Sequence, residues 1–446
     1  MGLIAAKNGP LTMSRAMASK AWLQRLADAN NILEMATITR TGTYRRASAY
    51  AAAQVAQGFA DFIGDLYAHP EKTVIHEDLI PPEILFAMGL TPWMAELIGI
   101  AVPMIQADFA EQFIDEAENL GVPPDTCSLP KTTIGLALKD EMPQGVAMVT
   151  SNMPCDGGMA SYTVLEKKLS IPTLRLDVPF NFYDERAVAY FADQLKDMVA
   201  WLEEHTPGRM DWDRLAEVCE ERNRAAAYET ELWDLLCEKP APLAADAVCL
   251  SHLMFMIAMP GQPRSTKVFK KLLEYARAIR AAGKGALPDE RYRAVLWNPP
   301  TLIYPELFVW AEQAYGVALI MDMLSYNRHP FVDTSSPDSM LKDLARIIME
   351  GPMARHTRGP MENFFGDLFS LYERFSLDMI WMAGHIGCKN TMALSGIFRE
   401  RCRERGIPLL VINYDLSDTR VVSPAGLRQQ AESFMETVMK AERIGP

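Results

Sequence analysis

Apolar residues in this chain form short continuous runs separated by longer segments with helical spacing. The runs are continuous rather than alternating, which is typical of strands covered on both faces of a parallel sheet. A helical pattern over about 158–169 lies between two of them and predicts a βαβ unit. The expected strands are residues 73–76, 145–150, 172–178, 291–298, 316–322, 377–383 and 408–413.

The order of these runs predicts an α/β fold with two lobes, each built on a parallel sheet flanked by helices. Residues 1–70 are rich in alanine at helical spacing, and we expect an N-terminal helical segment there. Lobe 1 is expected over 71–183 and lobe 2 over 291–446. Between them, residues 184–290 show helical patterns without a strand signal and predict a helical insert.

Composition narrows the classes of partner. The net charge of −13 argues against nucleic acid or an anionic membrane surface as the partner. Apolar runs stay below the roughly 18 residues that a membrane span needs, and the N-terminus lacks the apolar stretch of a signal peptide. We therefore expect a cytoplasmic protein. The sequence also lacks a P-loop, a G-x-S-x-G elbow, an H-E-x-x-H helix and any C-x-x-C pair.

Three of the seven cysteines share a local setting. Cys155 and Cys388 each follow an expected strand in a turn of small residues, and Cys127 precedes a helical pattern. Ligands of open α/β sheets bind beyond the carboxyl ends of strands, so three thiols there suggest an iron–sulfur cluster with one iron left open. Pattern alone leaves ordinary loop or core thiols as an equal alternative. The remaining cysteines lie in helical patterns and are expected to be buried or half-buried: Cys219, Cys237, Cys249 and Cys402.

Three segments resemble the cysteine segments of the 2-hydroxyacyl-CoA dehydratase and benzoyl-CoA reductase family. The first is 115–128 with Cys127. The second is 151–158 with Cys155, followed by 171–181, and the third is 384–390 with Cys388, followed by 406–420. The helical block between the lobes is also similar, and the resemblance spans roughly residues 70–440.

This resemblance implies a [4Fe-4S] cluster bound by Cys127, Cys155 and Cys388. In the family, a separate ATP-hydrolysing activator with its own iron–sulfur cluster supplies one electron, which passes to an acyl-CoA thioester. In the dehydratases a ketyl radical anion then expels the 2-hydroxyl group, whereas the benzoyl-CoA reductases keep the electrons in the ring. Two related subunits usually pair. A double-cubane [8Fe-9S] reductase and a non-catalytic partner subunit stay open as alternatives.

Further candidates surround the cysteines. His385, three residues before Cys388, is expected to donate to a cluster sulfur or act on a substrate proton; the alternative is a bond to loop backbone. Ser151 and Asn152 precede Cys155 and are candidates for contact with sulfur or the thioester oxygen, or for capping the next helix.

Two more pairs complete the expected site. His76 and Glu77 end the first strand and are expected to face the cleft. Arg355 and Arg358 lie in a loop bounded by glycine and proline, and are candidates for binding CoA phosphates. The alternative for these arginines is a solvated loop with surface ion pairs.

Overall fold

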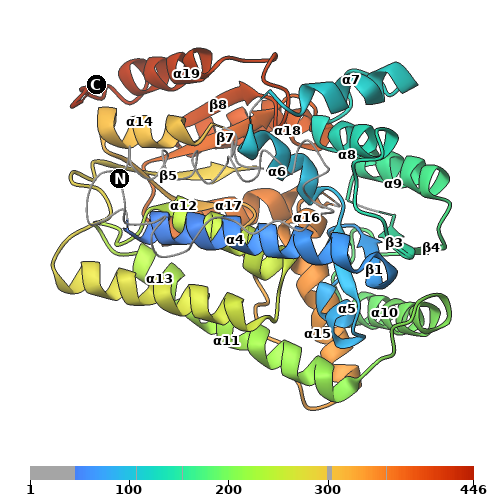
Figure 1. The fold of residues 1–446 in the computed structure, drawn as a ribbon. Helices are drawn as coiled ribbons and strands as arrows, with labels where there is room; N and C mark the ends of the chain where they lie inside the picture. Colours follow the sequence, from blue (N-terminus) through green and yellow to red (C-terminus); the bar gives the residue numbers. More distant parts are fainter. Residues whose placement is uncertain (1–45, 107, 153, 299–303, 358, 446) are drawn as a thin grey trace.

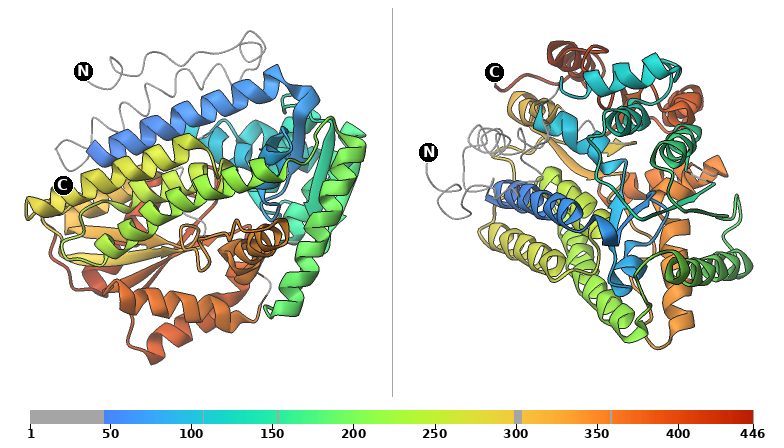
Figure 2. Two further views of the ribbon diagram at one scale, coloured as in Figure 1. Left: turned by 90° about the horizontal axis from the view of Figure 1, so that it is seen from below. Right: turned by 45° about the vertical axis from the view of Figure 1, so that its right-hand side comes forward.

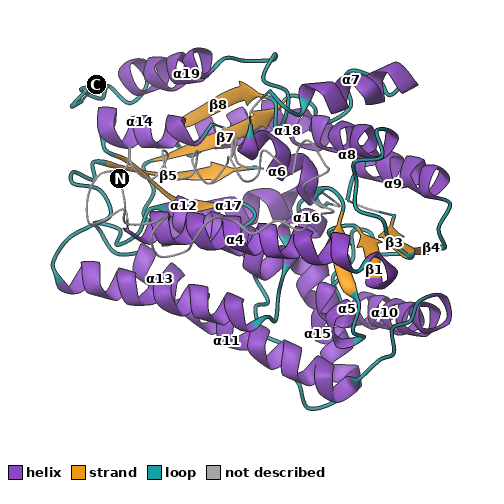
Figure 3. Cartoon of the chain, viewed as in Figure 1, coloured by secondary structure: helices purple, strands orange, loops and turns teal. Residues whose placement is uncertain are grey.

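The computed structural model describes residues 46–106, 108–152, 154–298, 304–357 and 359–445. Two four-stranded parallel sheets are surrounded by helices, as Figures 1 and 3 show. The α/β class with two lobes is therefore confirmed. The first 45 residues of the expected N-terminal helical segment lie outside the described residues.

Both sheets have the same strand order. Lobe 1 has the order β2-β1-β3-β4, and lobe 2 has the matching order β6-β5-β7-β8. In each lobe the first and third strands lie side by side in the centre, and the chain leaves them in opposite directions. Such a switch point opens a crevice beyond the carboxyl ends of the central strands. The strands are β1 (Thr73–His76), β2 (Thr91–Met94), β3 (Ala147–Ser151), β4 (Thr173–Leu176), β5 (Tyr292–Trp297), β6 (Val317–Asp322), β7 (Met379–His385) and β8 (Leu409–Tyr414).

The central strands β1, β3 and β7 are buried along their whole length, as their mainly apolar sequence predicts. Strand β2 was not among the expected strands. It contains Pro92, which cannot donate a ladder hydrogen bond and is therefore tolerated at the sheet edge that β2 occupies.

The expected helical insert consists of α10 (Glu185–His205), α11 (Trp212–Leu236), α12 (Ala245–His252), a π-helical turn (Leu253–Ala258) and α13 (Pro263–Ala281). Helix α4 (Arg46–Ala68) packs against α12 and α13, and α13 packs against α11. Figure 2 shows α4, α11 and α13 side by side. These long helices join the two lobes along one face of the molecule.

One helix of the C-terminal segment packs against the helical insert and shares a hydrophobic core with lobe 1 residues such as Val149 of β3. Helix α15 (Pro337–Glu350) contacts α10, and its residues Met340, Leu341 and Leu344 share a hydrophobic core with Val188 of α10. The lobes are thus tied together by more than the chain connections.

The other helices cover the sheets and connect their strands. They are α5 (Pro82–Ala87), α6 (Leu97–Ile105), α7 (Glu111–Leu120), α8 (Ser128–Leu138), α9 (Asp156–Leu169), α14 (Pro305–Tyr315), α16 (Pro352–Arg355), α17 (Met361–Arg374), α18 (Lys389–Glu404) and α19 (Pro424–Thr437). Across the described parts of the chain, none of the helices is both long and apolar enough to cross a membrane.

Candidate functional site

The three candidate cysteines occupy the same position relative to a helix. Cys127 is the N-cap of α8, Cys155 of α9 and Cys388 of α18. Cys155 follows β3 and Cys388 follows β7, which are equivalent strands of the two lobes. The partial positive charge at a helix N-terminus favours a thiolate there. Each of the three cysteines therefore lies at the positive end of a helix dipole.

Gly387 allows the Cys388 turn to approach Cys127 closely, and Gly157 lies in ordinary contact with the same residue. A Cβ at Gly387 would lie 2.6 Å from the Cα of Cys127, and a Cβ at Gly157 would lie 3.8 Å from the Cβ of Cys127. Gly387 directly precedes Cys388, and Gly157 lies two residues after Cys155. Cys127 is thus positioned between the turns that carry the other two thiols, although all three are distant in sequence.

The thiols also affect one another electrostatically. Burial raises the pKa of Cys127 well above its ordinary value, and the neighbouring Cys155 and Cys388 raise it further. Burial, and next the charge of the Glu96 carboxyl, raise the pKa of Cys155 to about 12. Three thiolates at this spacing repel one another, so a bound cation is needed to stabilise all of them in ionised form.

Three cysteine thiols are a donor set of the kind that binds an iron–sulfur cluster. Within the described residues, no three histidine, cysteine, aspartate or glutamate side chains converge closely enough to bind one metal ion. In a cubane each cysteine binds a different iron, so its ligands are more widely spaced than those of one ion. Cys155 is exposed and the other two are half-buried. This arrangement suits a cluster near the protein surface.

His385 contacts a different cysteine from the one that its position in the sequence suggested. Its Nε2 lies 3.0 Å from the Sγ of Cys127, while the backbone N–H of Leu416 donates to its Nδ1 over 3.2 Å. Because Nδ1 accepts that bond, the neutral ring carries its proton on Nε2 and donates it toward the sulfur. Burial lowers the pKa of His385, which favours this neutral form.

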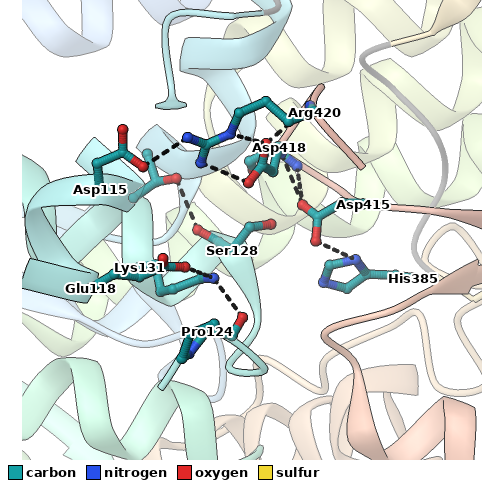
Figure 4. Close-up of polar contacts among 11 residues, drawn as sticks. Asp115, Glu118, Pro124, Ser128, Lys131, His385, Asp415, Asp418 and Arg420 are labelled. Atoms are coloured by element: carbon teal, nitrogen blue, oxygen red, sulfur yellow. Dashed lines mark hydrogen bonds and ion pairs between the residues drawn. The ribbon is translucent and has the colours of Figure 1, made fainter. Parts of the chain in front are cut away.

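Charged side chains connect the lobes around the thiols. Arg420, in the loop after β8, donates to Asp115 of α7 and to Asp418 (Figure 4). Lys389, directly after Cys388, binds Asp125 over 2.8 Å, two residues before Cys127. The Arg420 bonds join the loop after β8 to α7, and the exposed Lys389 pair joins the Cys388 turn to the segment that carries Cys127.

Two acids that the sequence analysis did not select lie beside Cys155. Asp78 follows β1 and Glu96 follows β2, and burial raises the pKa of Asp78 to about 7. Burial, and next the charge of Asp78, raise the pKa of Glu96 to about 8. Their position just after a strand is the sequence feature that could have indicated these acids. Glu77 has the same feature, and the sequence prediction named Glu77 and not Asp78.

Replacing Glu96 by glutamine is expected to change how stability depends on pH. The native state keeps the Glu96 proton up to about pH 8, whereas an unfolded glutamate loses it near its ordinary value of 4.5. Stability therefore falls between those values as pH rises, by up to about 1.4 kcal/mol per pH unit. Urea unfolding of the metal-free chain at several pH values should show a shallower fall for Glu96→Gln. The exposed control Glu404→Gln should retain the wild-type slope; equal slopes in all three proteins would contradict the assignment.

The candidate residues at the strand ends of lobe 1 are largely buried, and within the described residues no cleft-facing position is shown for His76 or Glu77. His76 is buried, its Nδ1 lies 2.7 Å from the carbonyl oxygen of Glu77, and burial lowers its pKa to about 4. Glu77 is also buried, as is Ser151 at the end of β3. Asn152 exchanges hydrogen bonds with the backbone of Val178 and so joins the ends of β3 and β4. Catalysis by His76 and Glu77, and substrate binding by Ser151 and Asn152, stay predictions.

Of the two arginine candidates, Arg355 lies in the described part of the chain. Arg355 donates to Asp367 over 2.9 Å and lies over the ring of Tyr183. His356 and Arg328 contact the same carboxylate. Arg358 lies outside the described residues. Binding of CoA phosphates by either arginine stays a prediction.

Replacing Gly387 by alanine is expected to destabilise the chain by about 1–3 kcal/mol, because the new methyl group overlaps the Cys127 backbone. Gly396→Ala, in α18, is the matched control. No atom lies within 4 Å of its added Cβ, so it should be neutral or stabilising by about 0.5–1 kcal/mol. Urea unfolding of both variants measures the difference; a Gly387→Ala variant as stable as the control would show that these turns are not in contact.

Known proteins are similar in sequence to most of the chain. The model of the family described as 2-hydroxyglutaryl-CoA dehydratase, D-component, matches residues 79–438, a range that includes all three cysteines. The chain belongs to this D-component family. The resemblance to 2-hydroxyacyl-CoA dehydratases seen in the cysteine segments is thereby confirmed.

Several individual proteins are similar to the chain at low identity. The lactoyl-CoA dehydratase alpha subunit of Anaerotignum propionicum is 22% identical, over 80% of this chain and 88% of its own. The (R)-2-hydroxyisocaproyl-CoA dehydratase alpha subunit of Clostridioides difficile is 23% identical, over 74% and 81%. A benzoyl-CoA reductase subunit of Thauera aromatica is 25% identical, over 73% and 79%. Dehydratase subunits and a benzoyl-CoA reductase subunit are thus similar to this chain at comparable identity.

Proposed function

We propose that the chain is the cluster-bearing subunit of a 2-hydroxyacyl-CoA dehydratase, with a [4Fe-4S] cluster bound by Cys127, Cys155 and Cys388. The observation that supports this most strongly is the meeting of three helix N-caps, two from lobe 1 and one from lobe 2. When bound, such a cluster supplies a single electron to the thioester carbonyl, the chemistry that forms a ketyl radical anion and lets the 2-hydroxyl group leave.

Side chains of the protein orient the cysteine ligands and donate and accept protons. His385 donates from Nε2 to the sulfur of Cys127, which fixes that ligand and withdraws charge from it. Asp78 and Glu96 keep at least one proton between them at neutral pH, because the pKa of each is raised. One proton from this pair neutralises the departing hydroxide, and the β-proton of the substrate restores it. Water is released and the pair returns to its starting state.

Partners follow from the same proposal. The dehydratase relatives are named as alpha subunits, so we infer a related second subunit for this chain. No P-loop occurs in the sequence, and we place ATP hydrolysis on a separate activator protein with its own iron–sulfur cluster.

Benzoyl-CoA reduction is the second candidate, supported by the similarity to the benzoyl-CoA reductase of Thauera aromatica. The same cysteines would serve both reactions. Product analysis separates them: an enoyl-CoA formed from a 2-hydroxyacyl-CoA supports the dehydratase, whereas a cyclic diene formed from benzoyl-CoA supports the reductase.

The first test is the iron and acid-labile sulfide content after anoxic purification. About four of each per chain, with a broad thiolate-to-iron absorbance band, is the expected result. About eight of each would point instead to a double-cubane [8Fe-9S] reductase. No iron after careful reconstitution would overturn the proposal in favour of a non-catalytic partner subunit.

A further inference from the structure

A cavity of about 100 Å³ lies where both lobes and the helical insert meet. Helix α5 of lobe 1, α11 of the insert and α15 of the C-terminal segment surround it, and Figure 1 shows these helices together below the sheet of lobe 1. The π-helical turn adds Met256 and Ile257 to the wall. Turns of this type are frequent at functional sites.

The cavity adjoins the thiol site through Asp78. This residue lines the cavity, and its Oδ1 is buried without a hydrogen-bond partner among the described residues. Its charge acts on Glu96, whose Oε1 lies 3.1 Å from the position of a Cβ at Gly158. The N–H of Gly158 in turn donates to the Sγ of Cys155. A ligand group in the cavity would thus be separated from the thiols by the carboxyl groups of Asp78 and Glu96.

Most of the cavity wall is apolar. Leucine, isoleucine, proline and methionine side chains from several separate elements form this apolar part of the wall. They include Leu79, Pro82, Met256, Leu344, Ile347 and Ile348. A wall of this kind binds hydrocarbon and gives no hydrogen bond along most of its surface.

The basic side chains of the described wall are already paired. Arg222 donates to the Oε1 of Glu83 over 2.8 Å and to a backbone carbonyl oxygen. The Nδ1 of His252 lies 2.6 Å from the Oε1 of Glu229. A second carboxylate on a ligand would find Asp78 and Glu83 nearby and no unpaired cation among these side chains. Burying such a charge without a partner is strongly unfavourable.

The volume sets an upper limit on the group that fits. An apolar cavity of about 150 Å³ is known to bind benzene. A cavity of about 100 Å³ is smaller than that and suits an aliphatic group of a few carbons. It is far below the several hundred Å³ typical of sites for whole ligands, so it would receive only part of an acyl-CoA.

We propose that this cavity receives the side chain of the acyl group, and that the substrate is a short aliphatic 2-hydroxyacyl-CoA rather than a dicarboxylic or aromatic one. This inference rests on the proposed dehydratase function. The thioester and the 2-hydroxyl group would then lie beside Asp78, between the cavity and Cys155.

A binding series tests the proposal. Calorimetry on the anoxically purified full chain would compare propionyl-, butyryl-, 4-methylpentanoyl-, glutaryl- and benzoyl-CoA with free CoA. Affinity should rise roughly fourfold for each added methylene that is buried. Glutaryl-CoA and benzoyl-CoA should bind at least tenfold more weakly than 4-methylpentanoyl-CoA.

Two variants of one wall residue should change this preference in opposite directions. Ile348→Phe fills the cavity and should remove the gain with chain length, leaving the affinity for free CoA unchanged. Ile348→Ala enlarges it and should improve benzoyl-CoA binding at least threefold. Ile444→Phe, at an exposed isoleucine remote from the cavity lining, is the matched control.

The outcomes separate this proposal from the function on which it rests. Equal or tighter binding of glutaryl-CoA, or a chain-length gain that survives in Ile348→Phe, overturns the cavity assignment. Turnover by the complex with its activator and second subunit is assayed in parallel. Dehydration of 2-hydroxyglutaryl-CoA in preference to the aliphatic substrates would keep the dehydratase function and reject the cavity. Absence of any dehydration would reject the function, while the binding series still decides what the cavity accepts.

Discussion

Replacing Cys388 by serine is expected to reduce the iron content of the anoxically purified chain from about four atoms to less than one. Lobe 2 contributes this single thiol to the proposed ligand set, and serine is a much weaker ligand for iron than a thiolate. Loss of one of three ligands leaves two thiols on one lobe, too few to hold a cubane. Dehydratase activity of the assembled complex should fall by more than about 10³-fold.

Cys237→Ser is the matched control. Cys237 is half-buried at the end of α11, and its sulfur donates to the backbone carbonyl oxygen of Trp233, a bond that a serine hydroxyl can also make. This variant should retain the iron and the absorbance of the parent chain. Full iron content in Cys388→Ser would remove Cys388 from the site.

Replacing Arg222 by methionine should have the largest effect on stability, about 3–5 kcal/mol. Arg222 and Glu83 are both almost completely buried and form an ion pair between α11 and α5. Without the guanidinium, the Glu83 carboxyl stays in a low-dielectric environment with no counter-charge. Urea unfolding at pH 7 measures the loss in the free energy of unfolding.

The control for this variant lies two residues along the same helix. Arg224 pairs with Glu221 at the surface, where its side chain is 54% exposed. Surface ion pairs contribute roughly 0–1 kcal/mol, so Arg224→Met should change stability little. The double variant Glu83→Leu with Arg222→Met should recover most of the loss. Similar losses in Arg222→Met and Arg224→Met would mean that burial of the first pair has no energetic consequence.

Much of the fold was predictable because its signals are local. The central strands are mainly apolar, and every expected strand is present with ends shifted by at most a few residues. Strand β2 was not predictable in this way, since it is short, contains Pro92 and is stabilised by pairing with β1. The packing of α15 against α10 also depends on contacts between distant segments.

In the site too, features encoded by local sequence were predictable, whereas contacts between distant residues were not. Strand-end turns with small residues pointed to Cys155 and Cys388, and their place at helix N-caps agrees with that prediction. The contact of His385 with Cys127 joins residues 258 positions apart, and sequence proximity instead suggested Cys388. The buried pair of Glu83 with Arg222 likewise joins residues 139 positions apart, so no local pattern indicates it. Burial and partner choice are properties of the folded chain, which is why Asp78 and Glu96 were also missed.

The matching strand order of the two sheets gives the chain an internal pseudosymmetry. Cys155 and Cys388 are related by it, each following the third strand of its lobe. Cys127 has no such counterpart, because the equivalent connection in lobe 2, residues 323–378, contains no cysteine. A fully symmetric crevice would accept a ligand in two interchangeable orientations. The third cysteine removes that degeneracy, so a molecule entering between the halves meets two unlike sides and can be held in one direction only.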